Sequence, residues 1–122
     1  MIFDSRYFWV LFTEKDVQVV GKLRSIYDKS KHRRVSSITV YEIYKLSLDK
    51  EGKDVADIRT TSIKSEFKII DVDSDIAEEA ARIANKSRKP MADCLILGTA
   101  RKFSDACVTD DPHFDEVKRV WI

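Results

Sequence analysis

Hydrophobic and polar positions follow two different spacings along the chain, one typical of helices and one of strands. Apolar residues three to four positions apart predict helices, and shorter apolar or alternating runs predict strands. The predicted helices cover residues 13–30, 39–50, 53–66, 75–89 and 91–103, the last being nearly apolar and therefore buried. The predicted strands cover residues 1–3, 67–72, 106–109 and 119–122, with another short strand at Val35.

Strands therefore alternate with helices, and this order is typical of a parallel sheet with helices on both faces. No internal repeat or linker divides the chain, and 122 residues suit one domain with its own core, so we expect a single α/β domain over residues 1–122. In such folds ligands bind beyond the carboxyl ends of the strands.

Composition narrows the class of protein only slightly. Lys and Arg number 22 and Asp and Glu 21, and a net charge of +1 does not by itself mark a nucleic-acid binder. Cys94 and Cys107 lie in apolar surroundings, without the spacing of a zinc site, which favours a reduced, cytoplasmic protein. The apolar residues at the amino terminus are interrupted by Asp4 and Arg6 and are too few for a membrane span. We therefore expect no membrane partner.

Four acidic residues stand at junctions between predicted elements. Asp4 follows the first strand, and Asp111 follows a late strand. Glu42 lies in the first turn of the helix after Val35, and Asp93 lies in the first turn of the nearly apolar helix. Since the carboxyl ends of parallel strands meet at one edge of a sheet, these acids are candidates for a common site.

Each acid also has a structural explanation. Asp111 followed by Pro112 is typical of an N-cap with proline at N1. Thr39 and Glu42 have the spacing of a capping box. Asp93 suits a helix N-terminus, where the macrodipole favours a negative charge. Asp4 could cap the turn that follows it.

Taken together, the acids indicate a metal site. Buried carboxylates are costly unless they are paired, and converging carboxylates repel one another. A divalent cation relieves both costs, and hard oxygen ligands select Mg²⁺ or Mn²⁺.

The segments MIFDS, SSITVYEI, PMADCLILGTA and VTDDPHF, taken in order, resemble the PIN-domain ribonucleases, and among them the VapC-type toxins of toxin–antitoxin pairs. The resemblance implies a three-layer α/β/α sandwich with a short, mostly parallel central sheet, and an endoribonuclease that depends on Mg²⁺ or Mn²⁺. Its catalytic and metal-binding acids would be Asp4, Glu42, Asp93 and Asp111.

We expect Asp4, Asp93 and Asp111 to bind metal directly or through water, and Glu42 to be a ligand or to position the attacking water. The candidates for supporting roles are Ser5, Arg6, Thr109 and Asp110, of which Thr109 matches the hydroxyl residue of the T-x-D pattern and Asp110 its variable position. Arg6 departs from the small or polar residue common in the family. It could point away, neutralise the acids or contact RNA phosphate.

Several other polar segments have weaker functional interpretations. The basic residues Lys31, Arg33 and Arg34 lead into Val35, whose strand is expected to point toward the proposed site. They could therefore contact RNA phosphates, or simply form a solvated face. The acids of residues 71–75 end a strand and start a helix, which favours a structural role. We interpret His113 as a turn or packing residue.

The leading functional hypothesis is a toxin that cleaves RNA, forms a homodimer and is held inactive by a small antitoxin. Two alternatives stay open. The first is a housekeeping nuclease that processes RNA, and the second is a non-catalytic RNA- or partner-binding module with the same fold.

Overall fold

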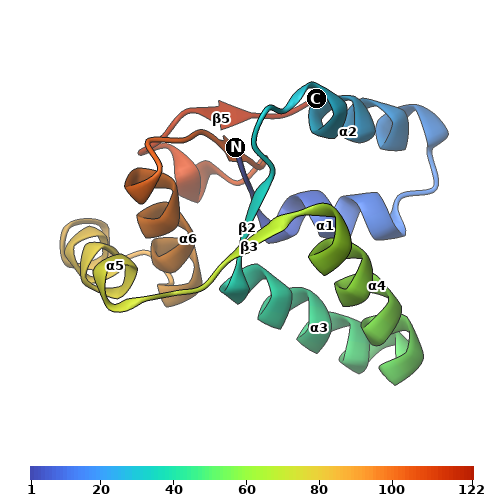
Figure 1. Cartoon of the computed structure of the whole chain (residues 1–122), viewed down its shortest axis with the longest axis horizontal. Helices are drawn as coiled ribbons and strands as arrows, with labels where there is room; N and C mark the ends of the chain where they lie inside the picture. Colours follow the sequence, from blue (N-terminus) through green and yellow to red (C-terminus); the bar gives the residue numbers. More distant parts are fainter.

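A five-stranded, wholly parallel sheet forms the centre of the molecule in a computed structural model that describes residues 1–122 (Figure 1). The strand order is β3-β2-β1-β4-β5. The strands are short, and their bounds are Ile2–Phe3 (β1), Arg34–Ser36 (β2), Lys68–Ile70 (β3), Cys107–Val108 (β4) and Arg119–Val120 (β5). The first strand along the chain is therefore the middle strand of the sheet.

Helices cover both faces of this sheet. They are α1 (Ser5–Thr13), α2 (Val17–Lys29), α3 (Ser37–Glu51), α4 (Lys53–Glu66), α5 (Ser74–Ser87), α6 (Met91–Lys102) and the short 3₁₀ helix η1 (Pro112–Phe114). Figure 1 shows α5 and α6 on one side of the sheet and α1, α2, α3 and α4 on the other. None of the helices has both the length and the apolar character needed to cross a bilayer.

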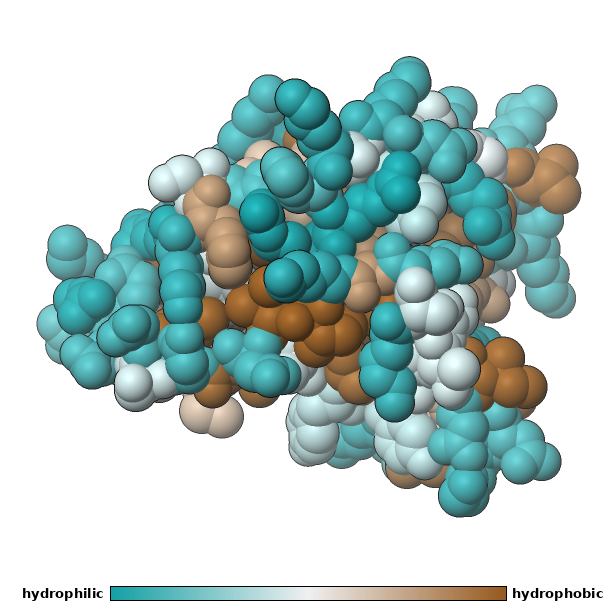
Figure 2. Space-filling view, viewed as in Figure 1, coloured by the Kyte–Doolittle hydropathy of each residue, from teal (hydrophilic) through white to brown (hydrophobic).

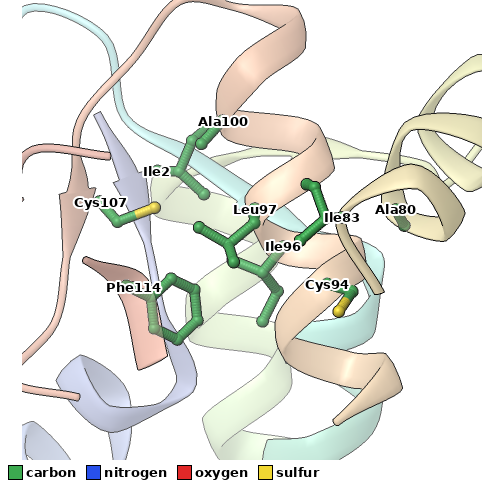
Figure 3. Packing of buried hydrophobic residues seen from close by; sticks show 9 residues of the cluster. All are labelled: Ile2, Ala80, Ile83, Cys94, Ile96, Leu97, Ala100, Cys107 and Phe114. Atoms are coloured by element: carbon green, nitrogen blue, oxygen red, sulfur yellow. The ribbon is translucent and has the colours of Figure 1, made fainter. Parts of the chain in front are cut away.

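The pleat of β1 divides the core into two parts. Ile2 packs with residues of α5 and α6 and with Phe114 (Figure 3), whereas Phe3 points into a second cluster that contains Tyr7 and Phe67. Successive side chains of a strand point to opposite faces, so one buried strand serves both cores. The predicted three-layer α/β/α sandwich is confirmed, and the sheet is wholly rather than mostly parallel.

The helix α1 was not predicted from the sequence. Its residues 7–12 form an unbroken apolar run, which hides the helical period. Tyr7 and Phe8 are buried in it, and the ring of Phe8 lies edge-on to that of Phe67 with 5.0 Å between the ring centroids. The predicted start of the next helix at Thr13 is wrong, because α2 begins at Val17 after an N-cap by Asp16.

The start of α3 also differs from the prediction. The helix begins two residues before Thr39, and the Ser36 side chain accepts the cap hydrogen bond from the Ile38 amide at 3.1 Å. Thr39 is therefore inside the helix, and the predicted capping box with Glu42 is wrong. By contrast, the structural role of the acidic segment 71–75 is confirmed, because Asp73 caps α5 and pairs with Lys102.

Most of the surface in Figure 2 is hydrophilic, with a hydrophobic area near the middle of the face shown, in the region of β3. This strand is one edge of the sheet and has only three residues. A short edge offers few unpaired backbone groups to another chain.

The pair α5 and α6 packs closely because of one glycine. A Cβ atom at Gly98 would lie 3.0 Å from the carbonyl oxygen of Ile76 and 3.3 Å from the backbone nitrogen of Ala80. Both neighbours are backbone atoms of α5, so they cannot move aside as a side chain could. This contact sets the distance of α6, and hence of Asp93, from the rest of the layer.

We predict that Gly98→Ala lowers the free energy of unfolding by roughly 1–3 kcal/mol, the usual cost of overpacking. Gly21→Ala is the matched control, since Gly21 also lies within a helix and nothing stands within 4 Å of its added Cβ. That change should stabilise the protein by roughly 0.5–1 kcal/mol. Urea unfolding of both variants measures the two values, and equal effects of the two substitutions would contradict the close-packing explanation.

Candidate functional site

The four predicted acids line one cleft at the carboxyl edge of the sheet. Strands β1 and β4 pair directly, so the segments that follow Phe3 and Val108 emerge side by side. The cleft has a volume of about 230 Å³. Its lining residues are Asp4, Ser5, Arg6, Trp9, Glu42, Leu46, Asp93 and Asp111.

Each acid comes from a different element. Asp4 stands between β1 and α1, Glu42 is on α3, Asp93 is in the first turn of α6, and Asp111 is the N-cap of η1. The proline at the first position of η1 confirms the predicted cap, and the Asp111 carboxylate accepts a hydrogen bond from the His113 amide at 2.9 Å.

Asp4 is the most deeply buried of the four acids. Its exposed fraction is 3%, and the Thr109 hydroxyl donates to its Oδ2 atom at 2.8 Å. Burial raises the pKa of Asp4 to about 6, although the Thr109 hydrogen bond opposes the shift. Thr109 also accepts from the Asp111 amide at 3.1 Å, so one hydroxyl links two of the acids.

Glu42 is oriented by Ser5. The Ser5 hydroxyl donates to Glu42 Oε1 at 2.6 Å, and Ser5 follows Asp4 directly in the chain. Burial raises the pKa of Glu42. No basic side chain lies within 4 Å of the carboxylate of either Asp4 or Glu42, so neither negative charge is paired within the protein.

Asp93 and Asp111 meet at His113. The His113 Nδ1 atom lies 3.0 Å from Asp93 Oδ2 and 3.4 Å from Asp111 Oδ1. Burial raises the pKa of Asp93, and the charge of Asp111 adds to the shift. His113 lies in the turn of η1, as one of its two predicted roles requires, but its side chain is 52% exposed, so the packing role is wrong.

Arg6 is held at the mouth of the cleft by Asp110. The guanidinium donates from Nε to Oδ1 at 2.9 Å and from the Nη2 atom to Oδ2 at 3.0 Å. This pairing raises the pKa of Arg6 and lowers that of Asp110. Arg6 therefore neutralises Asp110, which is outside the predicted ligand set. It forms no ion pair with any of the four acids of the cleft.

The basic residues Lys31, Arg33 and Arg34 lie at the amino end of strand β2, whereas the cleft lies at the carboxyl ends of the strands. Arg34 pairs with Asp105 at 3.1 Å, and the Arg33 guanidinium lies 3.9 Å from the centroid of the Tyr27 ring. The predicted direction of the strand agrees with the structure, because β2 runs from these residues toward the cleft. The residues themselves lie at the amino end of β2, and their contact with RNA stays a prediction.

Sequence reasoning missed three residues of the site. Trp9 lies on the unpredicted helix α1 and Leu46 lies on α3, and both line the cleft. His113 had a usable signal. In a turn that begins with Asp-Pro, the residue two positions after the cap donates its amide to the cap carboxylate, which places its own side chain nearby.

The donor atoms of the cleft suit a divalent cation. Asp93, Asp111 and His113 each offer one ligand atom, and the three atoms lie within 4.8 Å of one another. Asp4 and Glu42 add two carboxylates without a basic partner to the surrounding wall. Carboxylate oxygens of this kind fit Mg²⁺ or Mn²⁺.

The family model described as PIN domain matches residues 5–120 of the chain. No curated protein sequence matches this chain. Among solved structures, the DNA-bound VapBC of Salmonella typhimurium is similar, with a TM-score of 0.81 and 14% identity over 98% of this chain and 96% of that chain.

Two further solved structures are similar over most of their length. The VapC20 toxin of Mycobacterium tuberculosis, which cleaves the sarcin–ricin loop, has a TM-score of 0.75 and 17% identity over 95% of this chain and 94% of that chain. A toxin–antitoxin complex from Klebsiella pneumoniae has a TM-score of 0.72 and 22% identity over 90% and 85%. At these identities the likeness shows a shared fold.

The raised pKa of Asp4 predicts an unusual dependence of stability on pH. The folded state holds this proton more tightly than the unfolded state, so the cost of ionising Asp4 appears as pH rises from 3.8 to about 6 and persists above it. Without metal, Asp4→Asn should be more stable than the wild type at pH 7.5, by up to about 3 kcal/mol. The difference should shrink as pH falls toward 4.

Urea unfolding in excess EDTA at several pH values measures this difference. Asp110→Asn is the control of opposite sign, because the lowered pKa of Asp110 contributes stability above its unfolded pKa that is lost at low pH. That variant should be less stable than the wild type at pH 7.5. A destabilised Asp4→Asn protein at this pH would contradict the assignment of Asp4 as a costly buried charge.

Proposed function

The chain belongs to the PIN domain family, and on that premise we propose that it is an endoribonuclease that depends on a divalent metal ion. The convergence of Asp4, Glu42, Asp93 and Asp111 on one cleft carries this proposal. An RNA phosphate would be repelled by these carboxylates alone. A cation bound between them reverses the local sign of charge and makes the cleft suitable for a phosphodiester.

Asp93 and Asp111 would hold the metal, with Asp4 as a third carboxylate acting directly or through water. Mg²⁺ or Mn²⁺ bound there would stabilise charge on the phosphoryl oxygens and activate a water molecule. The metal would also compensate for the burial of Asp4, whose only close side-chain partner is the neutral hydroxyl of Thr109. Thr109 would then act as a positioning residue for both Asp4 and Asp111.

Glu42 is suited to orient the attacking water and to accept its proton. Ser5 fixes one carboxylate oxygen by the 2.6 Å hydrogen bond and leaves the other free for the cleft. Burial raises the pKa of this carboxylate, and a higher pKa makes it a stronger general base near neutral pH. Trp9 also lines the cleft and would offer an aromatic surface for an unstacked base of single-stranded RNA.

We further propose that the protein is the toxin of a toxin–antitoxin pair, with a small antitoxin partner and a second copy of itself. Similar solved structures include toxins and their complexes from several bacteria. The surface of α3 supports a protein partner, because Tyr41 is 61% exposed and Leu48 41% exposed beside an apolar groove. A housekeeping nuclease and a non-catalytic binding module are the competing functions.

Cleavage of a mixed RNA pool tests the enzymatic function. The wild type should cleave with Mg²⁺ or Mn²⁺ and lose cleavage in excess EDTA. Asp93→Asn should reduce the rate by roughly 100-fold or more, because loss of even an outer partner of a metal ligand commonly costs 10–100-fold. Asp75→Asn is the matched control, since Asp75 is also in the first turn of a helix but lies outside this cleft.

The Asp75→Asn protein should cleave like the wild type. Full activity of Asp93→Asn, or full wild-type activity in EDTA, would overturn the proposed metal centre. Binding of RNA without cleavage under every metal condition would favour the non-catalytic module.

Growth of a bacterial host on induced expression tests the toxin role. The wild type should arrest growth, Asp93→Asn should not, and co-expression of the small open reading frame next to the gene should restore growth. Growth should be restored because an antitoxin that binds over the cleft would keep RNA away from it. Normal growth with a protein that cleaves RNA in vitro would favour the housekeeping nuclease instead.

A further inference from the structure

Three donor atoms from two segments converge at one corner of the cleft. The His113 Nδ1 atom lies 3.0 Å from Asp93 Oδ2 and 3.4 Å from Asp111 Oδ1. All three atoms fall within 4.8 Å of one another. No other group of three His, Cys, Asp or Glu residues brings its ligand atoms this close together. The proposed ligands Asp4 and Glu42 do not belong to this set of three.

The two separations from His113 Nδ1, 3.0 and 3.4 Å, agree with the edges of a metal coordination shell. Donor atoms about 2.1 Å from an octahedral ion stand about 3 Å from their nearest neighbours. A hydrogen bond alone accounts for one of the two contacts of His113 Nδ1, because a ring nitrogen carries at most one hydrogen and can direct it well to only one carboxylate. A shared metal ion accounts for both contacts.

The main chain of His113 is held in place on three sides. Its amide donates to the Asp111 carboxylate at 2.9 Å, and its carbonyl oxygen accepts from Lys89 Nζ at 2.6 Å. The next residue, Phe114, is fully buried beside Leu97 in the core shown in Figure 3. The imidazole therefore reaches the two carboxylates from a fixed turn, while its exposed half leaves a path for an ion.

We propose that His113 is a direct ligand of the catalytic metal ion through Nδ1, together with Asp93 and Asp111, and that this nitrogen gives the site a preference for Mn²⁺ over Mg²⁺. The proposal rests on the proposed function, because it assumes a divalent ion in this cleft. Imidazole is a good ligand for transition-metal ions, whereas Mg²⁺ binds oxygen and keeps several of its waters. Asp4 and Glu42 would act across the remaining coordination positions through water.

The competing role for His113 is that of an outer hydrogen-bond partner of Asp93. Loss of such a partner also weakens metal binding, commonly by 10–100-fold, so a fall in affinity does not separate the two roles. An outer partner strengthens the binding of Mg²⁺ and Mn²⁺ alike, because it acts through the carboxylate. A nitrogen ligand favours Mn²⁺ selectively and places a nitrogen nucleus in contact with the ion.

Pulsed electron paramagnetic resonance of the Mn²⁺-loaded protein detects that nitrogen. The chain has two histidines, His32 and His113, so ¹⁵N-histidine labelling restricts the signal to these two residues. We expect a histidine nitrogen coupling in the wild type, its loss in His113→Gln and its retention in His32→Gln. Calorimetric titration should show that His113→Gln lowers the ratio of Mn²⁺ affinity to Mg²⁺ affinity by roughly tenfold or more.

Bound Mn²⁺ without histidine coupling, or an equal loss of affinity for both ions in His113→Gln, would overturn the proposal. RNA cleavage by the same preparations separates this failure from that of the proposed function. Metal-dependent cleavage that is abolished by Asp93→Asn, with no nitrogen coupling, removes only the role of His113. No Mn²⁺ binding and no cleavage removes both, whereas nitrogen coupling without cleavage keeps the ligand and removes the nuclease.

Discussion

The concentration of unpaired negative charge at one end of the sheet is the constraint on which the site depends. Asp4 is almost fully buried and Glu42 partly buried, and neither has a basic partner. The charge is tolerated because neutral hydroxyls hold each carboxylate, Thr109 for Asp4 and Ser5 for Glu42. Hydroxyls orient a carboxylate without neutralising it, so the cleft keeps the charge that a cation requires.

Arg6 is the one basic side chain that lines the cleft, and its pairing with Asp110 keeps it from pairing with these acids. A bidentate pair uses two of the donor groups of Arg6 and fixes the plane of its guanidinium. The T-x-D segment thus divides its two neighbouring acids between different tasks. Asp110 holds the arginine, and Asp111 caps η1 while facing the cleft.

The sequence predicted the elements with a clear period and the acids at their junctions. The helices at residues 53–66 and 91–103, the parallel sheet and the cap at Asp111 agree with the structure. Helix α1 was missed because six consecutive apolar residues, 7–12, hide its period. The contacts of His113 and the pairing of Arg6 depend on how loops meet across more than 100 residues or between two segments, which no local pattern encodes.

The position of β1 at the centre of the sheet has a consequence for the order of folding. Its neighbours begin at residues 34 and 107, so the middle strand stays without one of its partners until nearly the whole chain has left the ribosome. Long sequence separations of this kind slow folding, because the loop must close before the contacts form. Asp4 meets Thr109 only at that stage, so an unfinished chain carries the first acid of the site but no assembled cleft.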